Sequence, residues 1–196
     1  MSEKTEAPKA GENYKLTKTI VLTGMMGCGK SAIGRRLAAK LGFDFKDSDT
    51  EIEQAAAMSV TDIFDQHGEA YFRDGEKRVI ERLLNEPAHI MAIGGGAFCQ
   101  PQTRALIQKH ACSIWLKTDL DELVRRVNKR PGKRPLLANG DPKKILAELL
   151  EKRSPDYEKA DITIVSSSGT HQKTVKAVIA ELTQCGILIS EGEKRA

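Results

Sequence analysis

The stretch Gly24-Met25-Met26-Gly27-Cys28-Gly29-Lys30-Ser31 decides the fold, because it matches the pattern G-x-x-x-x-G-K-[ST]. Glycines in this pattern let backbone N–H groups turn inward around phosphate oxygens at the start of a helix. A run of apolar and β-branched residues, 19–22, comes directly before the stretch. Apolar residues recur every fourth position after it, at Ile33, Leu37 and Leu41. The sequence therefore predicts a buried strand, a phosphate loop and an amphipathic helix, which Gly42 would end.

This loop predicts a site for the phosphates of a nucleoside triphosphate and for Mg²⁺. The Lys30 ammonium would reach the β- and γ-phosphates, and the Ser31 hydroxyl would hold Mg²⁺. Nucleotide contacts are expected along the loop and the first helical turn, from Gly27, Cys28, Gly29, Lys30, Ser31 and Ala32. Two interpretations of Cys28 stay open: a small side chain that fits the loop, or a thiol through which oxidants and alkylating reagents inactivate the protein.

The composition is that of one globular domain. The chain has 196 residues, of which 40% are hydrophobic, enough for one well-buried core. No uncharged apolar run approaches the roughly 20 residues that span a bilayer, and the first residues lack the apolar region of an export signal. We therefore expect a cytoplasmic protein with no membrane partner. The four cysteines lack metal-type Cys-x-x-Cys spacing and are expected to be reduced thiols.

The net charge of +4 is concentrated in one segment. Residues 125–134 hold six basic side chains and no acidic one, so the rest of the chain is slightly acidic. A local cluster indicates a site for an anion rather than a coat for nucleic acid. Only 5% of the residues are aromatic, and no stacking platform for bases is evident. We therefore expect no nucleic-acid partner, although a solvated basic helix face remains an alternative interpretation of this segment.

Strand and helix patterns alternate along the chain. Further strands are expected at residues 43–46, 89–93, 113–116 and 162–165. Further helices are expected at 51–58, 59–68, 69–84, 119–128, 141–152 and 172–184, with Ser59 and Thr118 as amino-terminal caps. The alternation predicts a three-layer α/β/α fold around a five-stranded parallel sheet. Ligands of such sheets bind at the carboxyl ends of the strands, so the chemistry should follow residues 22, 46, 93, 116 and 165.

Two groups of charged residues are candidates for the acceptor site. Asp47 and Asp49 follow the second predicted strand, where one carboxylate could face a metal and the other an acceptor hydroxyl. An Asp-rich turn that caps the next helix is the alternative. Arg73 and Glu76 lie three residues apart on one predicted helix, and they could also be a mere surface pair.

Three further features of the sequence are candidates for the binding sites. Gly94, Gly95 and Gly96 follow the third predicted strand and would expose backbone N–H groups beside the site, or form only a flexible turn. Arg134 ends the basic segment, and Arg153 stands beyond the helix that follows it.

Together these motifs resemble one family, the shikimate kinases, which are small P-loop enzymes of the nucleoside-monophosphate-kinase type. The resemblance covers about residues 18–182, and the motifs occur in the family's order. They are GMMGCGKS at 24–31, DSD at 47–49, F-R-x-x-E at 72–76, GGGA at 94–97, RPLL at 134–137 and KR-x-P-x-Y at 152–157. The resemblance implies a P-loop kinase fold with a mobile lid. It also implies transfer of the ATP γ-phosphate to the 3-hydroxyl of shikimate, a step toward chorismate and the aromatic amino acids.

The resemblance also implies which residues bind shikimate. Direct contacts would come from Asp49, Arg73, Gly95 and Arg153, with Gly94 and Gly96 beside them. Glu76 would orient Arg73. Forked guanidinium donors suit the carboxylate of shikimate, and Asp49 would accept the proton of the attacking hydroxyl.

On the nucleotide side, the resemblance implies that Ser31 and Asp47 hold Mg²⁺ directly or through water. Arg134 would reach over ATP from the lid, and Arg126 would flank the adenine. Lys30 and Arg134 would act beside Asp49 as catalytic residues, because the transferred phosphoryl group needs cations on its oxygens. A Walker-B acid at the end of a strand is missing, since residues 90–93 run into glycine, and Asp47 is the substitute candidate.

We expect a single kinase domain at residues 18–185, between flexible tails at 1–17 and 186–196. Its acceptor-binding region would cover about 47–85, and a lid that closes over ATP about 129–141. The absence of heptads predicts a monomer. Two alternative functions stay open: a related small-molecule kinase, such as a gluconate kinase, and a nucleic-acid-binding P-loop protein that uses the basic segment.

Overall fold

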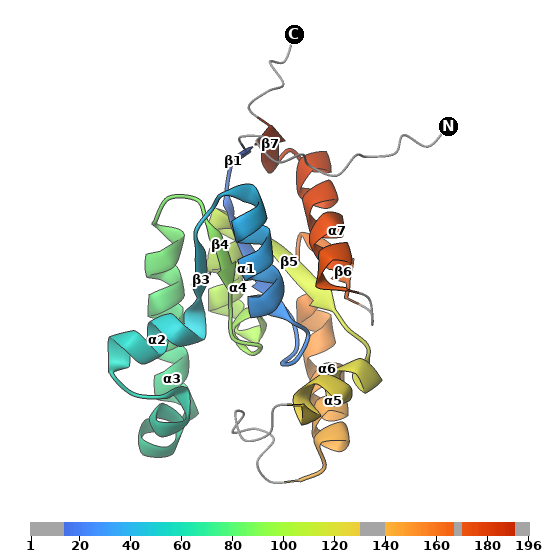
Figure 1. The fold of residues 1–196 in the computed structure, drawn as a ribbon. Coiled ribbons are helices and arrows are strands. Elements are labelled where there is room, and N and C mark those ends of the chain that lie inside the picture. Colours follow the sequence, from blue (N-terminus) through green and yellow to red (C-terminus); the bar gives the residue numbers. More distant parts are fainter. Residues whose placement is uncertain (1–13, 130–139, 167–169, 191–196) are drawn as a thin grey trace.

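A five-stranded parallel sheet forms the centre of the computed structural model (Figure 1), which describes residues 14–129, 140–166 and 170–190. The strands are β2 (Thr19–Thr23), β3 (Phe45–Asp47), β4 (Ile90–Ala92), β5 (Ala111–Lys117) and β6 (Ile162–Val165). Their order is β3-β4-β2-β5-β6, and every neighbouring pair is parallel. The predicted five-stranded parallel sheet is confirmed.

Helices cover both faces of this sheet (Figure 1). On one face α1 (Lys30–Leu41) packs against α7 (His171–Gln184), and on the other α4 (Pro101–His110) packs on β5. The remaining helices are α2 (Ser48–Ala56), α3 (Val60–Leu84), α5 (Leu120–Asn128), α6 (Pro142–Tyr157) and the short 3₁₀ helix η1 (Ala97–Cys99). Because both faces are covered, Ile20, Val21 and Leu22 of β2 are fully buried. The three-layer α/β/α architecture is confirmed.

Three features of the fold were not predicted from the sequence. Helix α4 occupies residues for which no element was expected. Strands β1 (Tyr14–Leu16) and β7 (Leu188–Ser190) lie in stretches assigned to the tails, and they pair with each other in an antiparallel sheet. The two helices expected at 59–68 and 69–84 are joined in α3, with a kink at Gly68, whose φ of 81° suits glycine.

Two predicted helix boundaries were wrong. Helix α6 continues past residue 152 to Tyr157 although Pro155 lies inside it, so Arg153 stands within this helix rather than beyond it. The amino-terminal cap of α5 is Asp119 and not Thr118, because the Asp119 side chain accepts a 2.8 Å hydrogen bond from the Glu122 amide. In the described parts of the chain, no helix is both long and apolar enough to cross a membrane.

Candidate active site

The phosphate loop connects β2 to α1 at the carboxyl edge of the sheet, as predicted. Its backbone turns where the Cys28 amide donates to the Met25 carbonyl at 3.2 Å. The Lys30 ammonium lies over the first half of the loop and donates to the carbonyls of Gly24 at 2.9 Å and Met25 at 3.2 Å. These bonds hold a positive charge at the loop, close to the helix terminus that attracts phosphate.

Ser31 and Asp47 lie together beside this loop. The Ser31 hydroxyl donates a 2.6 Å hydrogen bond to Asp47 Oδ2. Asp47 ends β3 and caps α2, since its Oδ1 accepts from the Asp49 amide at 3.2 Å. A hydroxyl and a carboxylate in contact provide two of the hard oxygen ligands that Mg²⁺ prefers. Among the described residues, no group of three or more His, Cys, Asp and Glu side chains could hold a metal ion by itself.

The glycine turn after β4 brings two carboxylates together. A Cβ on Gly94 would lie 2.5 Å from Glu76 Oε1 and 3.0 Å from Asp49 Oδ1, so only glycine leaves room for both. The Gly94 amide donates to the Ser48 hydroxyl at 3.1 Å, which ties the turn to the first residue of α2. Asp49 on α2 and Glu76 on α3 therefore both lie against the backbone of Gly94.

Desolvation by neighbouring protein atoms raises the pKa of both carboxyls, although Asp49 is an exposed residue and Glu76 is buried. Desolvation by surrounding protein atoms, followed by repulsion from Asp47, raises the pKa of Asp49. Glu76 is only 1% exposed, and desolvation raises its pKa to about 7 against the opposing attraction of Arg73. Glu76 Oε1 has no hydrogen-bond partner among the described residues. Perturbed carboxyls next to a phosphate loop are typical of a catalytic site.

Arg73 is held in place by carboxylates on its own helix. Its guanidinium donates to Glu76 at 2.7 Å on one side and to Glu69 at 3.1 and 3.2 Å on the other. A Cβ on Gly96 would lie 2.5 Å from this guanidinium, so Arg73 lies against the glycine turn. Arg73 and Glu76 are thus a largely buried pair beside the glycine turn and not the surface pair that was the alternative.

Arg153 approaches the same turn from α6. A Cβ on Gly95 would lie 3.4 Å from the Arg153 guanidinium, 3.3 Å from the Gly24 carbonyl and 3.6 Å from the Met26 amide. Gly95 is therefore enclosed between Arg153 and the phosphate loop. The structure thus places Arg73, Arg153, Asp49 and the phosphate loop around the three glycines.

Arg126 on α5 contacts the outer side of the phosphate loop. Its guanidinium donates to the carbonyls of Cys28 at 2.8 Å and Gly27 at 3.5 Å, and to Glu122 Oε1 at 2.6 Å. Sequence reasoning missed Glu122, although its position four residues before Arg126 on a helix is a signal for such a pair. The predicted lid over 129–141 is described only at its ends, and Arg134 lies outside the described residues.

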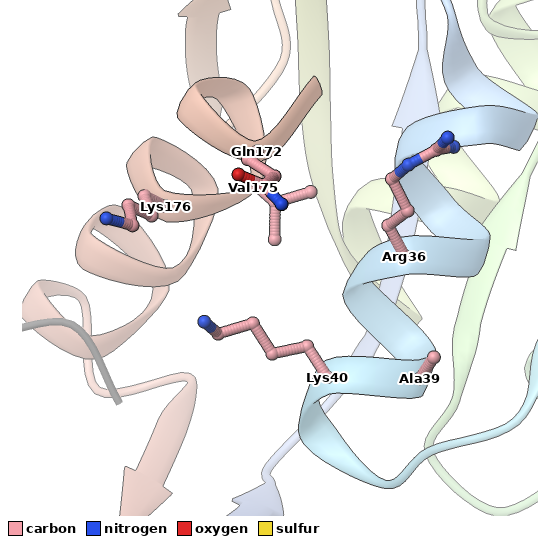
Figure 2. A pocket seen from close by; sticks show the side chains of 6 residues that line it. All are labelled: Arg36, Ala39, Lys40, Gln172, Val175 and Lys176. Carbon is pink, nitrogen blue, oxygen red and sulfur yellow. The ribbon is translucent and has the colours of Figure 1, made fainter. Parts of the chain in front are cut away.

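A pocket of about 540 Å³ lies between α1 and α7, apart from the residues described above (Figure 2). Its cationic side chains do not converge. Arg36 folds back along α1 and donates to the Ala32 carbonyl at 2.9 Å, and Lys176 points away from α1, whereas Lys40 reaches across toward α7. We assign no ligand to this pocket.

Comparison with known proteins gives the family. The sequence model of the family described as "Shikimate kinase" matches residues 26–183. A shikimate kinase of Caulobacter vibrioides is 50% identical over 167 residues, covering 85% of this chain and 83% of that protein. One of Bradyrhizobium diazoefficiens is 52% identical over 165 residues, covering 84% and 79%. The solved structure of shikimate kinase from Acinetobacter baumannii, in complex with shikimate, superposes with a TM-score of 0.82 at 33% identity, covering 86% of this chain and 94% of that one. On these matches and on its fold, the chain belongs to the shikimate kinase family.

Proposed function

We propose that this site transfers the γ-phosphate of ATP to the 3-hydroxyl of shikimate, giving shikimate 3-phosphate and ADP. One observation supports this most strongly. The turn Gly94, Gly95 and Gly96 lies against Asp49, Arg73 and Arg153 and also borders the phosphate loop. Groups for a hydroxylated acid and groups for a triphosphate therefore meet at one edge of the sheet.

The acceptor would be bound by charge and by shape. Arg73 and Arg153 offer two guanidinium groups for its carboxylate, and such forked donors bind carboxylates with two parallel hydrogen bonds. Glu76 holds Arg73 at 2.7 Å and so fixes the direction of one fork. The amides of Gly94, Gly95 and Gly96 would border the ring of the acceptor.

Asp49 would accept the proton of the attacking hydroxyl. Its carboxylate lies beside Gly94, and its raised pKa makes it a stronger base than an ordinary aspartate. The hydroxyl oxygen then forms a bond to the γ-phosphorus as the bond from that phosphorus to the bridging β,γ-oxygen breaks. ADP leaves with the electron pair of the broken bond, and the proton stays on Asp49 until solvent removes it.

The phosphate loop and its neighbours would hold ATP. Loop amides from Gly27 to Ala32 surround the phosphates, Lys30 contacts the β- and γ-phosphates, and Arg126 borders the nucleotide from α5. The hydroxyl of Ser31 and the carboxylate of Asp47, 2.6 Å apart, fit Mg²⁺ together with phosphate oxygens and water. Mg²⁺ would neutralise charge that develops on the phosphates. Arg134 would do the same from a lid over 129–141, which would also exclude water.

The function is tested by ADP release in a coupled assay with shikimate, gluconate, nucleoside monophosphates or no acceptor. We expect turnover with shikimate only; turnover with gluconate alone would establish the related kinase instead.

Three variants test the roles of individual residues. Asp49→Asn should lower kcat by about 10²-fold or more while ATP binding persists. Lys30→Ala should abolish turnover, and Arg134→Ala should lower kcat more than it changes the KM for shikimate. Wild-type turnover in Asp49→Asn would refute the assignment of the base.

We also propose a cytoplasmic monomer. Free ATP is a cytoplasmic co-substrate, and all four cysteines are free thiols, as expected in a reducing compartment. Among the described residues, Tyr71 and Val165 are the large hydrophobic side chains that are exposed, and they lie on different elements, α3 and β6. Light scattering after size-exclusion chromatography should give the mass of one chain.

A further inference from the structure

Tyr157 is the last residue of α6, and its side chain is fully buried although it carries a hydroxyl group. Its ring stacks on Trp115 of β5 with centroids 5.8 Å apart. Its hydroxyl lies 3.9 Å from Met25 Sδ in the phosphate loop, and it donates a hydrogen bond to the carbonyl of Gly95. One side chain therefore contacts both the phosphate loop and the turn that borders the acceptor.

Arg153 is joined to the same arrangement. It lies four residues before Tyr157, so the two side chains project from the same face of α6. Gly95 lies between the two: its carbonyl accepts from Tyr157, and a Cβ on its other side would lie 3.4 Å from Arg153. The Tyr157 hydroxyl and the Arg153 guanidinium therefore both lie against Gly95.

We propose that Tyr157 is a positioning residue for the acceptor, whose hydroxyl fixes the Gly95 turn and Arg153 at a set distance from the phosphate loop. The inference rests on the proposed function, because it concerns where the carboxylate of shikimate lies relative to the γ-phosphate. Packing alone does not require the hydroxyl, since a phenylalanine ring would keep the stacking on Trp115. A displacement of about 1 Å between reacting groups can lower a rate by about 10²-fold.

The test is Tyr157→Phe, assayed with shikimate and ATP varied separately. We expect kcat/KM for shikimate to fall by about tenfold or more, mostly through a higher KM, while the KM for ATP changes by less than about twofold. Trp115 is the only tryptophan of the chain, and a Cβ on Gly24 would lie 3.3 Å from its ring. Its fluorescence should therefore report ADP binding, which should be unchanged in the variant.

Ser113→Ala is the matched control for a loss of stability. Ser113 is buried on β5, two residues from Trp115, and its hydroxyl donates to Asp161 at 2.6 Å and accepts from the Asp161 amide at 3.0 Å. Like Tyr157→Phe, this control removes a buried hydroxyl and its hydrogen bonds. Those bonds join β5 to Asp161, the residue before β6, and not to the glycine turn. We expect it to lower the unfolding temperature and to leave the KM for shikimate unchanged.

A rescue variant distinguishes the loss of the hydrogen bond from a general loss of stability. Placing 4-aminophenylalanine at position 157 restores a donor toward the Gly95 carbonyl, and it should return the KM for shikimate to within about threefold of the wild type. A Tyr157→Phe enzyme with the wild-type KM and kcat for shikimate would overturn the inference. So would a rise in this KM that Ser113→Ala reproduces at equal loss of stability. Absence of wild-type turnover with shikimate would instead refute the proposed function, and the inference with it.

Discussion

The Ser31 hydroxyl donates to Asp47 Oδ2 at 2.6 Å, so the first turn of α1 and the end of β3 meet at one hydrogen bond. In Asp47→Asn, the Mg²⁺ concentration for half-maximal turnover should rise by about tenfold, because an amide carries no charge for a hard cation. A Mg²⁺ titration at saturating ATP measures this. Asp44→Asn, an exposed aspartate three residues earlier, is the control and should leave the requirement unchanged. An equal Mg²⁺ requirement in Asp47→Asn and the wild type would remove Asp47 from the metal site.

Gly94 and Gly75 should respond in opposite ways to substitution by alanine. In Gly94→Ala the new Cβ would lie 2.5 Å from Glu76 Oε1, so Glu76 and Asp49 must move, and kcat/KM for shikimate should fall by about 10²-fold. In Gly75→Ala the Cβ enters open space inside α3, so the variant should be about 0.5–1 kcal/mol more stable, with unchanged kinetics. Steady-state kinetics and urea unfolding measure both effects. Normal kinetics in Gly94→Ala would show that the turn tolerates a side chain.

Glu76 should make the stability depend on pH. Burial raises its pKa from 4.5 to about 7, so between these values the folded protein keeps a proton that the unfolded chain has lost. Its contribution therefore decreases the free energy of unfolding as the pH rises through this window, by at most about 3 kcal/mol. Glu76→Gln should remove this decrease.

Urea unfolding of the wild type and Glu76→Gln at several pH values from about 4.5 to 8 isolates this contribution, because other groups titrate in both proteins. Glu81→Gln, an exposed change on the same helix, should keep the pH dependence of the wild type. If the two curves for the wild type and Glu76→Gln ran parallel over this range, Glu76 would titrate as an ordinary glutamate.

Glu122 should affect the binding of ATP although it lies outside the phosphate loop. Hydrogen bonds from Arg125 and then Arg126 lower the pKa of Glu122 to about 2, so it is ionised at neutral pH. In Glu122→Ala, Arg126 loses the 2.6 Å contact that directs it toward the carbonyls of Gly27 and Cys28. The Kd for ADP should rise by about fivefold or more, as measured by calorimetry. Glu148→Ala on α6 is the control, and an unchanged Kd in Glu122→Ala would contradict this role.

Features encoded by neighbouring residues were predictable from the sequence. The glycines of residues 24–31 and the apolar spacing of Ile33, Leu37 and Leu41 specify the loop and α1 locally, and both are present. Ligands of parallel sheets bind at the carboxyl ends of the strands, and this rule predicts that the Asp47 and Gly94 regions lie beside the loop. The structure brings these regions together.

Features that depend on distant partners were not predictable. Helix α4 buries only Thr103 and Ile107, too few residues for a visible apolar stripe. Strand β1 is defined by β7, and Tyr14 and its partner Ser190 are far apart in the sequence. The predicted end of α6 near residue 152 was wrong, because the helix continues through Pro155 to Tyr157, whose side chain is buried in the core. The role of Tyr157 is likewise visible only once Gly95 and Trp115 are known to surround it.

The pairing of β1 with β7 also has a consequence for biosynthesis. Leu16 of β1 lies opposite Leu188, so β1 cannot pair until β7 has been synthesised. Strands β2, β3 and β4 lie closer together in the sequence, so all the residues of their pairings are synthesised earlier than those of this ribbon. Strands β1 and β7 also bring the first and last described segments of the chain together.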